Sequence, residues 1–567
     1  MKPVVFLVLR RMRAPLLAPI AAYAIAVVGL VLIPGQDANG EPWRMTIFHA
    51  LYFVSFMSTT IGFGEIPYAF TNAQRLWVLF CIFLTVSVWL YAIGKLIALL
   101  QDKTFQRALA ERRFATLVRR LSDPFYLVCG YGETGSALVQ ALTDRHQRAV
   151  VIDIKPERIA LLQLENLREF VPALAADARQ PHRLLDAGLS HPLCAGAVAL
   201  TNVNATNLKI AITAKLLHPR IKVICRADSR AIEANMASFG TDHIFDPFET
   251  FALSLATRIH SPQLTRLYQW LTSRSGMPPA ATRPPPAEGR WILCGYGRFG
   301  RALHKHLADP SREFIVIEAQ PDRTGRPTGA KLVTGPGTEA DTLEQASVCD
   351  AVGLVAGTDD DANNLSIIMT ARELNRDLFV VARENQSENH GLFFAVEADI
   401  IMHPSTVLAE RIAELLGTPL LTEFCHQASH QDDDWAGRLL QCLEAMVSDQ
   451  PLAVWETRIE AEQAPAVATA VETGTHLDLA TLNRNPRDRE DRLPCLVLLR
   501  LHGGEPQLLP DAGQAVQRGD QLLMCGQPWV RQRLAWTLQD PHALAYVLTG
   551  ETRDGFWHLA ANGRRFG

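Results

Sequence analysis

Residues 125–135 read Phe-Tyr-Leu-Val-Cys-Gly-Tyr-Gly-Glu-Thr-Gly, and this stretch decides the fold. Its first five residues predict a buried strand, and the glycine-rich turn leads at once into a helical pattern through Leu142. The next apolar run ends at Asp153. Glycines at this spacing permit a tight turn and close approach of the backbone to a pyrophosphate, while the helix N-terminus faces the phosphates and the acid suits the ribose hydroxyls. The sequence therefore predicts a dinucleotide-binding α/β unit.

The same unit recurs later in the chain. We call residues 130–135 the first fingerprint and residues 295–300 the second. An acid follows each at the same spacing, and alternating strands and helices predict a parallel sheet with ligand at the carboxyl ends of its strands. The candidate nucleotide-binding residues are Gly130, Tyr131, Gly132, Glu133, Thr134, Gly135 and Asp153 in the first unit, and Gly295, Tyr296, Gly297, Arg298, Phe299, Gly300 and Glu318 in the second.

Composition limits the classes of function. The chain has 567 residues, which is enough for several domains, and 48% of them are hydrophobic. With 55 Lys and Arg against 59 Asp and Glu, it lacks the basic excess of a nucleic-acid binder, so we expect no nucleic-acid partner. The ten cysteines form no C-x-x-C pair and are typical of reduced, buried thiols in a cytosolic body.

Two N-terminal segments predict a membrane hairpin. Residues 14–34 and 76–94 carry no formal charge, and each is about the roughly 20 residues that a helix needs to cross a bilayer. The alternative, a cleaved signal peptide before residue 34, is disfavoured because the second span would still anchor the chain. Basic residues flank the pair and place both termini and the α/β domains in the cytoplasm. They are Lys2, Arg10, Arg11, Arg13, Lys95, Lys103, Arg107, Arg112 and Arg113.

The connection between the spans is apolar but does not end as a spanning helix does. Residues 45–64 contain no Asp, Glu, Lys or Arg and finish in Thr-Ile-Gly-Phe-Gly. Alternating glycines permit carbonyls that all point one way, and a ring of carbonyls can replace the hydration shell of K⁺. A re-entrant helix over residues 44–58 would aim the negative end of its dipole at the ion. The candidate filter residues are Thr60, Ile61, Gly62, Phe63 and Gly64, of which the first four are the candidate K⁺ ligands.

The order of these segments resembles the pore of two-transmembrane potassium channels, whose filter consensus is T-V-G-Y-G. Phe63 replaces the tyrosine of that motif and Glu65 its aspartate, so the resemblance implies K⁺ selectivity that is weaker than usual. By the same resemblance Gly94 is a hinge, although glycine also serves close helix packing. The resemblance places a hydrophobic gate one turn further on, at Leu96, Ile97, Leu99 and Leu100. The alternative for the whole region is a glycine-rich turn in a plain membrane anchor.

The α/β units are similar to the RCK, or TrkA-N, domain family. The resemblance rests on Ala-Asp-Ala at residues 176–178 and Ala-Val-Ala-Leu at 197–200, and it adds Asp177 to the candidate ligands. The second unit has Gly-Pro-Gly-Thr at residues 335–338, so that acid is missing there. The first unit in turn has Glu133 where the family usually has the arginine that the second keeps as Arg298.

Either unit can bind a nucleotide or can be retained for assembly alone. An acid at the end of the second strand would repel a 2′-phosphate, so NAD or an adenine nucleotide (ADP or ATP) is favoured over NADP. In the C-terminal region, three aspartates near two histidines can supply oxygen and imidazole ligands to a divalent cation such as Ca²⁺, or can form a solvated helix start. They are Asp432, Asp433, Asp434, His426 and His430, and residues 487–492 are expected to form a charged surface loop.

The predicted fold class is an α-helical pore of outer, pore and inner helices, two Rossmann-like α/β domains and a small α+β subdomain. The resemblances imply a homotetrameric, nucleotide-gated potassium channel in the bacterial inner membrane, surrounded by lipid, without catalysis. The alternatives are an anchored regulatory subunit of a potassium transporter and an anchored NAD-dependent oxidoreductase, for which no acid–base residue marks a hydride site. The expected domains are the pore at 1–103, the first RCK domain at 104–271, a stiff linker at 272–289, the second RCK domain at 290–415 and the C-terminal subdomain at 416–567.

Overall fold

The structure is a computed structural model, and it describes residues 2–59, 62, 66–273, 275–279 and 282–551. The chain divides into two compact units, Met1–Leu121 and Ser122–Gly567. The helix after residue 102 therefore belongs to the N-terminal unit, whereas the sequence grouped it with the first α/β domain.

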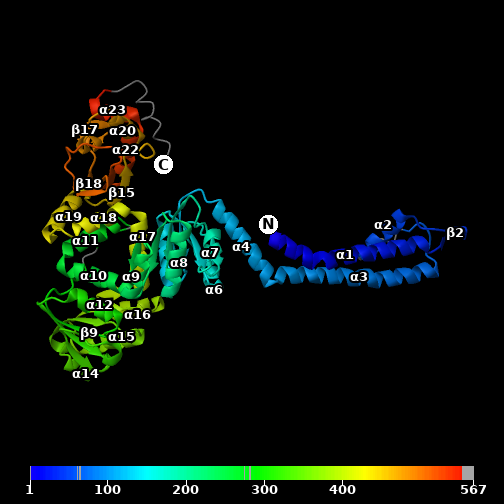
Figure 1. The fold of residues 1–567 in the computed structure, drawn as a ribbon, viewed down its shortest axis with the longest axis horizontal. Helices are drawn as coiled ribbons and strands as arrows, with labels where there is room; N and C mark the ends of the chain where they lie inside the picture. The colour runs from blue at the N-terminus through cyan, green and yellow to red at the C-terminus, as the bar shows by residue number, and fades with distance from the viewer. Residues whose placement is uncertain (1, 60–61, 63–65, 274, 280–281, 552–567) are drawn as a thin grey trace. The chain divides into compact units, whose positions relative to one another are not determined.

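The N-terminal unit is a hairpin of two long helices with a short helix at its closed end (Figure 1). The indole of Trp77 donates to the carbonyl of Ala26 over 3.2 Å and so ties the long helices together. Thr71 begins the second long helix with a capping box to Gln74. The elements are α1 (Lys2–Leu32), β1 (Gly35–Gln36), β2 (Pro42–Trp43), α2 (Ile47–Ser58), α3 (Asn72–Gln101) and α4 (Lys103–Arg119).

Apolar side chains cover both the inside and the outside of this hairpin. Ala26, Leu30 and Val54 are fully buried between the helices, whereas Ile20 and Phe83 are 65% and 68% exposed. Met12–Leu32 and Asn72–Gln101 have the length and hydropathy to cross a membrane. An exposed apolar surface of this extent needs lipid or another subunit against it.

The first α/β domain is built on a six-stranded parallel sheet in the order β5-β4-β3-β6-β7-β8, the doubly wound order. Its strands are β3 (Phe125–Cys129), β4 (Arg148–Asp153), β5 (Ala173–Ala175), β6 (Cys194–Ala199), β7 (Lys222–Arg226) and β8 (His243–Phe245). Its helices are α5 (Glu133–Asp144), α6 (Pro156–Leu164), α7 (Pro181–Asp186), α8 (Asn204–Leu217) and α9 (Arg230–Ser238).

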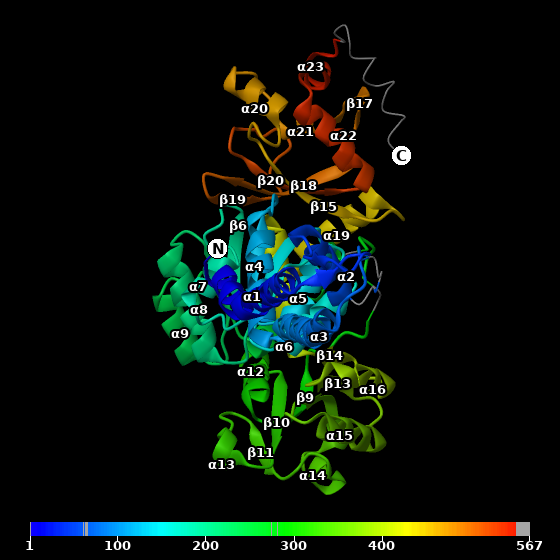
Figure 2. The same cartoon turned by 90° about the vertical axis from the view of Figure 1, so that its right-hand side faces the viewer.

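The second α/β domain repeats this topology in the order β11-β10-β9-β12-β13-β14. Figure 2 shows its sheet with α12 and α15 on opposite sides. Its strands are β9 (Gly289–Cys294), β10 (Arg312–Glu318), β11 (Lys331–Thr334), β12 (Ala351–Ala356), β13 (Phe379–Arg383) and β14 (Ile400–Met402). Its helices are α12 (Arg298–Leu307), α13 (Pro321–Thr324), α14 (Ala340–Gln345), α15 (Asp361–Leu374) and α16 (His390–Ala395).

The two domains exchange the helix that follows each sheet. Helix α10 (Pro247–His260) leaves the first domain and packs on α12, where Leu255 joins the core of the second domain. Helix α17 (Pro404–Gly417) leaves the second domain and packs on α5, where Ile412 joins the core of the first. Each domain therefore depends on the other to cover one face of its sheet.

The C-terminal part is an antiparallel sheet in the order β15-β20-β18-β19, packed on α11, α18 and α19. Residues 488–492 form a strand, so the expected loop there is wrong: the segment pairs with a neighbouring strand while its side chains stay mostly exposed. The elements are α11 (Pro262–Thr272), α18 (Pro419–Ala428), α19 (Asp433–Val447), β15 (Ala453–Arg458), α20 (Pro465–Glu472), α21 (Leu479–Leu482), β16 (Arg484–Asn485), β17 (Asp488–Arg492), β18 (Cys495–His502), β19 (Glu505–Leu508), β20 (Gln521–Gly526), α22 (Pro528–Gln539) and α23 (Pro541–Thr549).

The linker between the α/β domains is held by contacts on both sides. The carbonyl of Gly276 accepts from the indole of Trp270 and from the N–H of Leu452, at 2.9 and 2.8 Å. Further along, the guanidinium of Arg283 donates to the carbonyl of Asp377 over 2.7 Å. The linker is thus fixed to α11 and the C-terminal part at one end and to the second domain at the other.

Candidate functional site

Most of the predicted filter lies outside the described residues: Thr60, Ile61, Phe63, Gly64 and the neighbouring Glu65. Gly62 is described, and its φ of +66° is the left-handed backbone that favours glycine. The pore-helix prediction corresponds to α2, which begins after its cap Thr46 rather than at residue 44 and ends at Ser58, just before the predicted filter.

The predicted hinge and gate lie on α3. A Cβ added to Gly94 would meet no atom within 4 Å in the described chain, so close packing within one subunit does not explain this glycine. Leu96, Ile97 and Leu100 are 46%, 48% and 55% exposed, whereas Leu99 is buried. The three exposed leucine and isoleucine side chains are therefore free to meet another subunit or to line a pore.

The first fingerprint forms the tight strand-to-helix turn that its glycines predict. Gly130 has φ +107°, and a Cβ on Gly135 would lie 2.0 Å from the carbonyl oxygen of Gly130. Only glycine fits at that contact, because any side chain there would enter the backbone of the turn. Helix α5 then begins at Glu133, which places its free N–H groups at the carboxyl end of the sheet.

Asp153, the acid that the sequence predicted for the ribose hydroxyls, lies at the end of β4. The buried Asp153 carboxylate accepts the N–H of Tyr131 over 2.6 Å and that of Lys155 over 2.7 Å. The guanidinium of Arg158 lies 3.3 Å from the same carboxylate. Sequence reasoning missed Arg158, which lies on α6 and also borders the open side of Gly132.

The remaining candidates of the first unit are paired or buried. Glu133 is half-exposed, with Nε2 of His403 3.8 Å and Oγ of Ser405 3.4 Å from its carboxylate, both from the second copy. Thr134 is buried in the first turn of α5. Asp177 pairs with Arg179 at 2.8 Å, and the hydrogen bond from this guanidinium lowers the pKa of the carboxyl.

The second fingerprint repeats the backbone of the first. Gly295 has φ +94°, and a Cβ on Gly300 would lie 2.1 Å from the carbonyl oxygen of Gly295. The Glu318 carboxylate accepts the N–H of Tyr296 over 2.7 Å, as Asp153 does from Tyr131. A Cβ on Gly297 would meet nothing within 4 Å, which leaves room for a phosphate beside the loop.

Two buried side chains of the second fingerprint serve its core. Phe299 is fully buried against α10. The hydroxyl of Tyr296 lies 2.9 Å from Nδ1 of His304, and burial lowers the pKa of this histidine. Pro336 stands in the place of the missing acid. A Cβ on the next residue, Gly337, would come within 3.1 Å of the Sγ atom of Cys294, so the chain passes close to the strand there.

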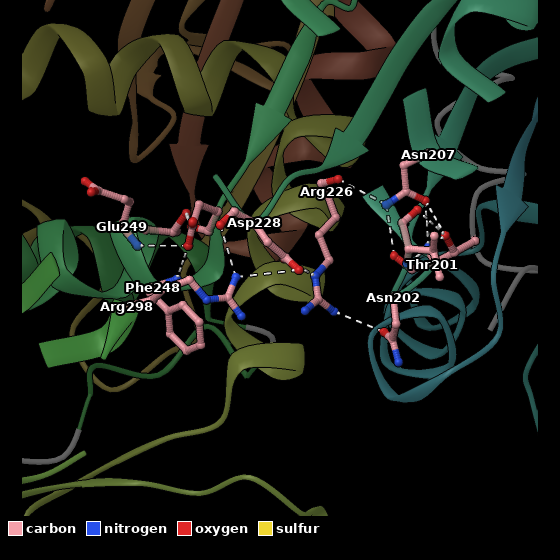
Figure 3. Close-up of polar contacts among 11 residues, drawn as sticks. Thr201, Asn202, Asn207, Arg226, Asp228, Phe248, Glu249 and Arg298 are labelled. Atoms are coloured by element: carbon pink, nitrogen blue, oxygen red, sulfur yellow. Dashed lines mark hydrogen bonds and ion pairs between the residues drawn. The ribbon is translucent and has the colours of Figure 1, made fainter. Parts of the chain in front are cut away.

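Arg298 contacts both the first domain and the exchanged helix (Figure 3). Its guanidinium donates to the carbonyl of Asp228 over 3.1 Å, lies 3.5 Å from that carboxylate and stacks 5.1 Å from the ring of Phe248. The carboxylate of Asp228 also accepts from Arg226 over 3.2 Å, so it holds one arginine from each copy. Sequence reasoning named Arg298 but had no way to find Asp228, which lies beyond β7 of the other domain.

Arg226 and Arg383 hold matching places at the ends of β7 and β13. The amide of Asn207 donates to the carbonyl of Arg226 over 3.1 Å, and the amide of Asn364 to that of Arg383 over 2.8 Å. The side chain of Arg383 stacks 4.8 Å from the ring of Phe248, and its burial lowers the pKa of the guanidinium. Each of these strand ends thus carries an arginine, and that of the second domain lies beside its fingerprint.

The divalent-cation prediction finds no support in the described residues, where no three His, Cys, Asp or Glu side chains gather closely enough to hold a metal ion. Asp432 caps α19 by accepting the N–H of Trp435 over 2.6 Å. Asp433 accepts the N–H of Leu264 over 3.0 Å at the start of α11. These aspartates therefore serve helix ends.

Comparison with protein families identifies three domains. Residues 18–102 match the ion channel family, and residues 126–247 and 291–404 match the TrkA-N domain family. The first match covers the apolar hairpin, and the other two cover the two doubly wound sheets. The fold class expected from the sequence is confirmed, with helices in the N-terminal unit and Rossmann-like sheets after it.

Among curated proteins, the chain is similar to potassium channel protein 1 of Methanocaldococcus jannaschii, at 25% identity over 25% of this chain and 44% of the relative. It is also similar to a Trk system potassium uptake protein TrkA homolog of Archaeoglobus fulgidus, at 27% identity over 24% of this chain and 31% of the relative. The chain spans less than half the length of the curated relatives it matches. Among solved structures, the GsuK channel bound to NAD is similar at 16% identity and a TM-score of 0.48, over 94% of this chain and 100% of that chain.

Proposed function

Since this chain joins an ion channel domain to two TrkA-N domains, we propose that it is a nucleotide-gated potassium channel of four identical subunits. The observation that carries the proposal is the order of α1, α2, residues 60–64 and α3 within the ion channel match. Similarity to potassium channel and potassium uptake proteins favours K⁺ as the permeant ion. The setting proposed is the bacterial inner membrane, with both termini and the TrkA-N domains in the cytoplasm.

The pore is assembled from four chains because one chain supplies a single Thr-Ile-Gly-Phe-Gly segment. The carbonyls of Thr60, Ile61, Gly62 and Phe63 face K⁺ and replace its hydration shell. The left-handed backbone of Gly62 supports this role, since alternation of such residues with ordinary ones turns successive carbonyls the same way. The exposed apolar sides of α1 and α3 meet lipid and the neighbouring subunits.

Nucleotides act from the cytoplasmic side. Helix α3 ends at Gln101, and Asp102 both ends it and caps α4, whose chain runs on to the first TrkA-N domain. NAD or an adenine nucleotide at a fingerprint changes the balance of open and closed pores by its difference in affinity for the two states. The ligand need only be held, so no residue is assigned to catalysis.

The test is K⁺ against Na⁺ flux through the purified protein in liposomes, with and without NAD. Gly62→Asp should abolish K⁺ flux, because Asp adopts φ +66° at a cost and brings a charge into the filter. Gly40→Asp is the matched control: Gly40 has φ +82° with no atom near its Cβ position, in the hairpin loop of the same unit.

The proposal is supported if the flux prefers K⁺ and responds to NAD. The flux should also be retained in Gly40→Asp and lost in Gly62→Asp. Absence of flux from correctly folded tetramers under every ligand contradicts it and favours an anchored regulatory subunit of a transporter.

A further inference from the structure

The fourth position of the fingerprint separates the two nucleotide sites. It is Glu133 in the first and Arg298 in the second, and each is the first residue of its helix, α5 or α12. A carboxylate is favourable at a helix N-terminus, whereas a guanidinium there opposes the helix dipole. The positive charge of Arg298 is therefore favourable at this position only when an anion lies beside it.

The carboxylates of Asp246 and Asp228 both attract Arg298 in the described chain. That of Asp228 lies 3.5 Å from Arg298 and 3.2 Å from Arg226, so it is shared between two arginines (Figure 3). A phosphate at the second fingerprint would meet Arg298 with more charge and shorter hydrogen bonds. Asp228 thus competes with a phosphate for Arg298.

A second arginine stands beside the first. Arg298 and Arg383 stack on the same ring, Phe248, at 5.1 and 4.8 Å. Within the described part of the chain Arg383 makes no ion pair, and its Nε atom is buried without a hydrogen-bond partner. The carboxylates of Asp359 and Asp361 act on it only at a distance, and Arg298 repels it.

The matching arginine of the first domain is already neutralised. Arg226 pairs with Asp228, and the residue in the place of Asp228 in the second copy is the neutral Asn385. Arg158 borders Gly132 of the first fingerprint, but its guanidinium is paired with the buried carboxylate of Asp153. The first fingerprint therefore combines a guanidinium that is already paired with the half-exposed carboxylate of Glu133.

The two classes of nucleotide differ in charge in a way that matches the two sites. The two phosphates of a dinucleotide such as NAD form a bridging pyrophosphate, with one negative charge each. A nucleoside diphosphate ends in a free terminal phosphate, which carries about 1.5 to 2 negative charges at neutral pH. Glu133 opposes that additional charge, while Arg298 and Arg383 attract it.

We propose that the two sites divide nucleotides by charge: the second fingerprint, through Arg298 and Arg383, takes a nucleotide that ends in a free terminal phosphate, and the first, with Glu133, takes a dinucleotide. The inference rests on the proposed function only in assuming that both fingerprints hold nucleotides. Asp228 sets the affinity of the second site, because a phosphate must draw Arg298 away from it.

The test is calorimetric titration of the full-length protein in detergent with ADP and with NAD, each alone and then with the other at saturation. The wild type should bind one ADP and one NAD per chain at the same time. Arg383→Gln should weaken ADP about tenfold or more and leave NAD within about twofold, since a charge-assisted hydrogen bond is lost at one site alone. NAD binding in the same sample shows that the variant is folded.

Two further variants should strengthen ADP binding. Asp228→Asn frees Arg298 and should tighten ADP severalfold. Glu133→Gln removes the repelling carboxylate and should let a second ADP bind per chain in the absence of NAD.

Any of three results would overturn the proposed division of nucleotides between the sites. They are two equivalent ADP sites in the wild type, one-for-one displacement of ADP by NAD, and equal loss of affinity for both ligands in Arg383→Gln. Binding is read without any flux measurement, so a protein that binds as described but conducts no K⁺ contradicts the channel proposal alone.

Discussion

The two TrkA-N domains share a backbone but differ in the charges placed on it. In both, a glycine turn, a buried acid and the N–H of a tyrosine meet in the same way, as in the pairs Tyr131–Asp153 and Tyr296–Glu318. What differs is the fourth residue of the turn, Glu133 against Arg298. Duplicated domains can thus keep the fold that positions a ligand while they change which ligand is favoured.

The exchanged helices also bring residues of each domain into the site of the other. Because α10 covers the second sheet and α17 the first, each site contains residues from both copies. His403 approaches Glu133, and Phe248 lies against Arg298. A residue from one domain therefore lies beside the phosphate loop of the other.

The largest expected effect comes from breaking this exchange. Leu255→Ala, on α10, should destabilise the second domain and Ile412→Ala, on α17, the first, each by about 2–5 kcal/mol, because each removes a buried side chain. Hydrogen exchange of the two sheets is the measurement. Leu253→Ala is the control, since this side chain on α10 is 57% exposed. Loss of protection in the sheet nearer in sequence, rather than in the other, would contradict the exchange.

A smaller effect is expected at the third glycine of each turn. Gly135→Ala and Gly300→Ala should each cost about 1–3 kcal/mol and remove one nucleotide per chain, because the new Cβ meets a backbone oxygen near 2 Å. Gly297→Ala should leave thermal stability unchanged, as its Cβ has open space, yet weaken ADP by filling the phosphate position. Unchanged ADP binding in Gly297→Ala would argue against a phosphate at that loop.

Lowering the pH should destabilise the second domain more than the first. Burial lowers the pKa of His304 in the second domain, and Val139 holds the matching place in the first. The unfolded chain therefore binds a proton that the folded domain rejects, so this contribution is complete above the unfolded pKa, about 6.5, and falls as pH drops below it. His304→Val should reduce the loss of stability between pH 7 and pH 5. An unchanged pH dependence by thermal denaturation would exclude His304 as its source.

The smallest effect is expected at Asp177, the acid that the second domain lacks. Its partner Arg179 is half-exposed, so Asp177→Asn should change the free energy of unfolding by less than about 1 kcal/mol. If Asp177 contacts the ligand, NAD affinity should fall a few-fold and ADP affinity should not change. Titration of both ligands checks this, and an equal change in the two would place Asp177 outside the first site.

The sequence predicted what depends on local backbone and missed what depends on partners far along the chain. Glycine spacing was enough for both fingerprints, since the turn is made by a few consecutive residues. Helix α10 follows the first sheet in the sequence, and nothing in its own residues says which sheet its apolar face covers, so the helix exchange was not predicted. Asp228, Arg158 and His403 escaped notice for the same reason: their roles arise only when separate strands or domains meet. The loop prediction for residues 487–492 was wrong because every residue there is charged, which hides the apolar alternation typical of a strand such as β17.

The measurement that tests the account most directly is K⁺ flux in liposomes with NAD or ADP, compared among wild type, Gly135→Ala and Arg383→Gln. The account predicts a wild-type pore that answers to both ligands, loss of the NAD response alone in Gly135→Ala, and a weakened ADP response alone in Arg383→Gln. A pore whose flux ignores both ligands, or in which each variant alters both responses equally, would contradict the claim that two unlike nucleotide sites control one potassium pore.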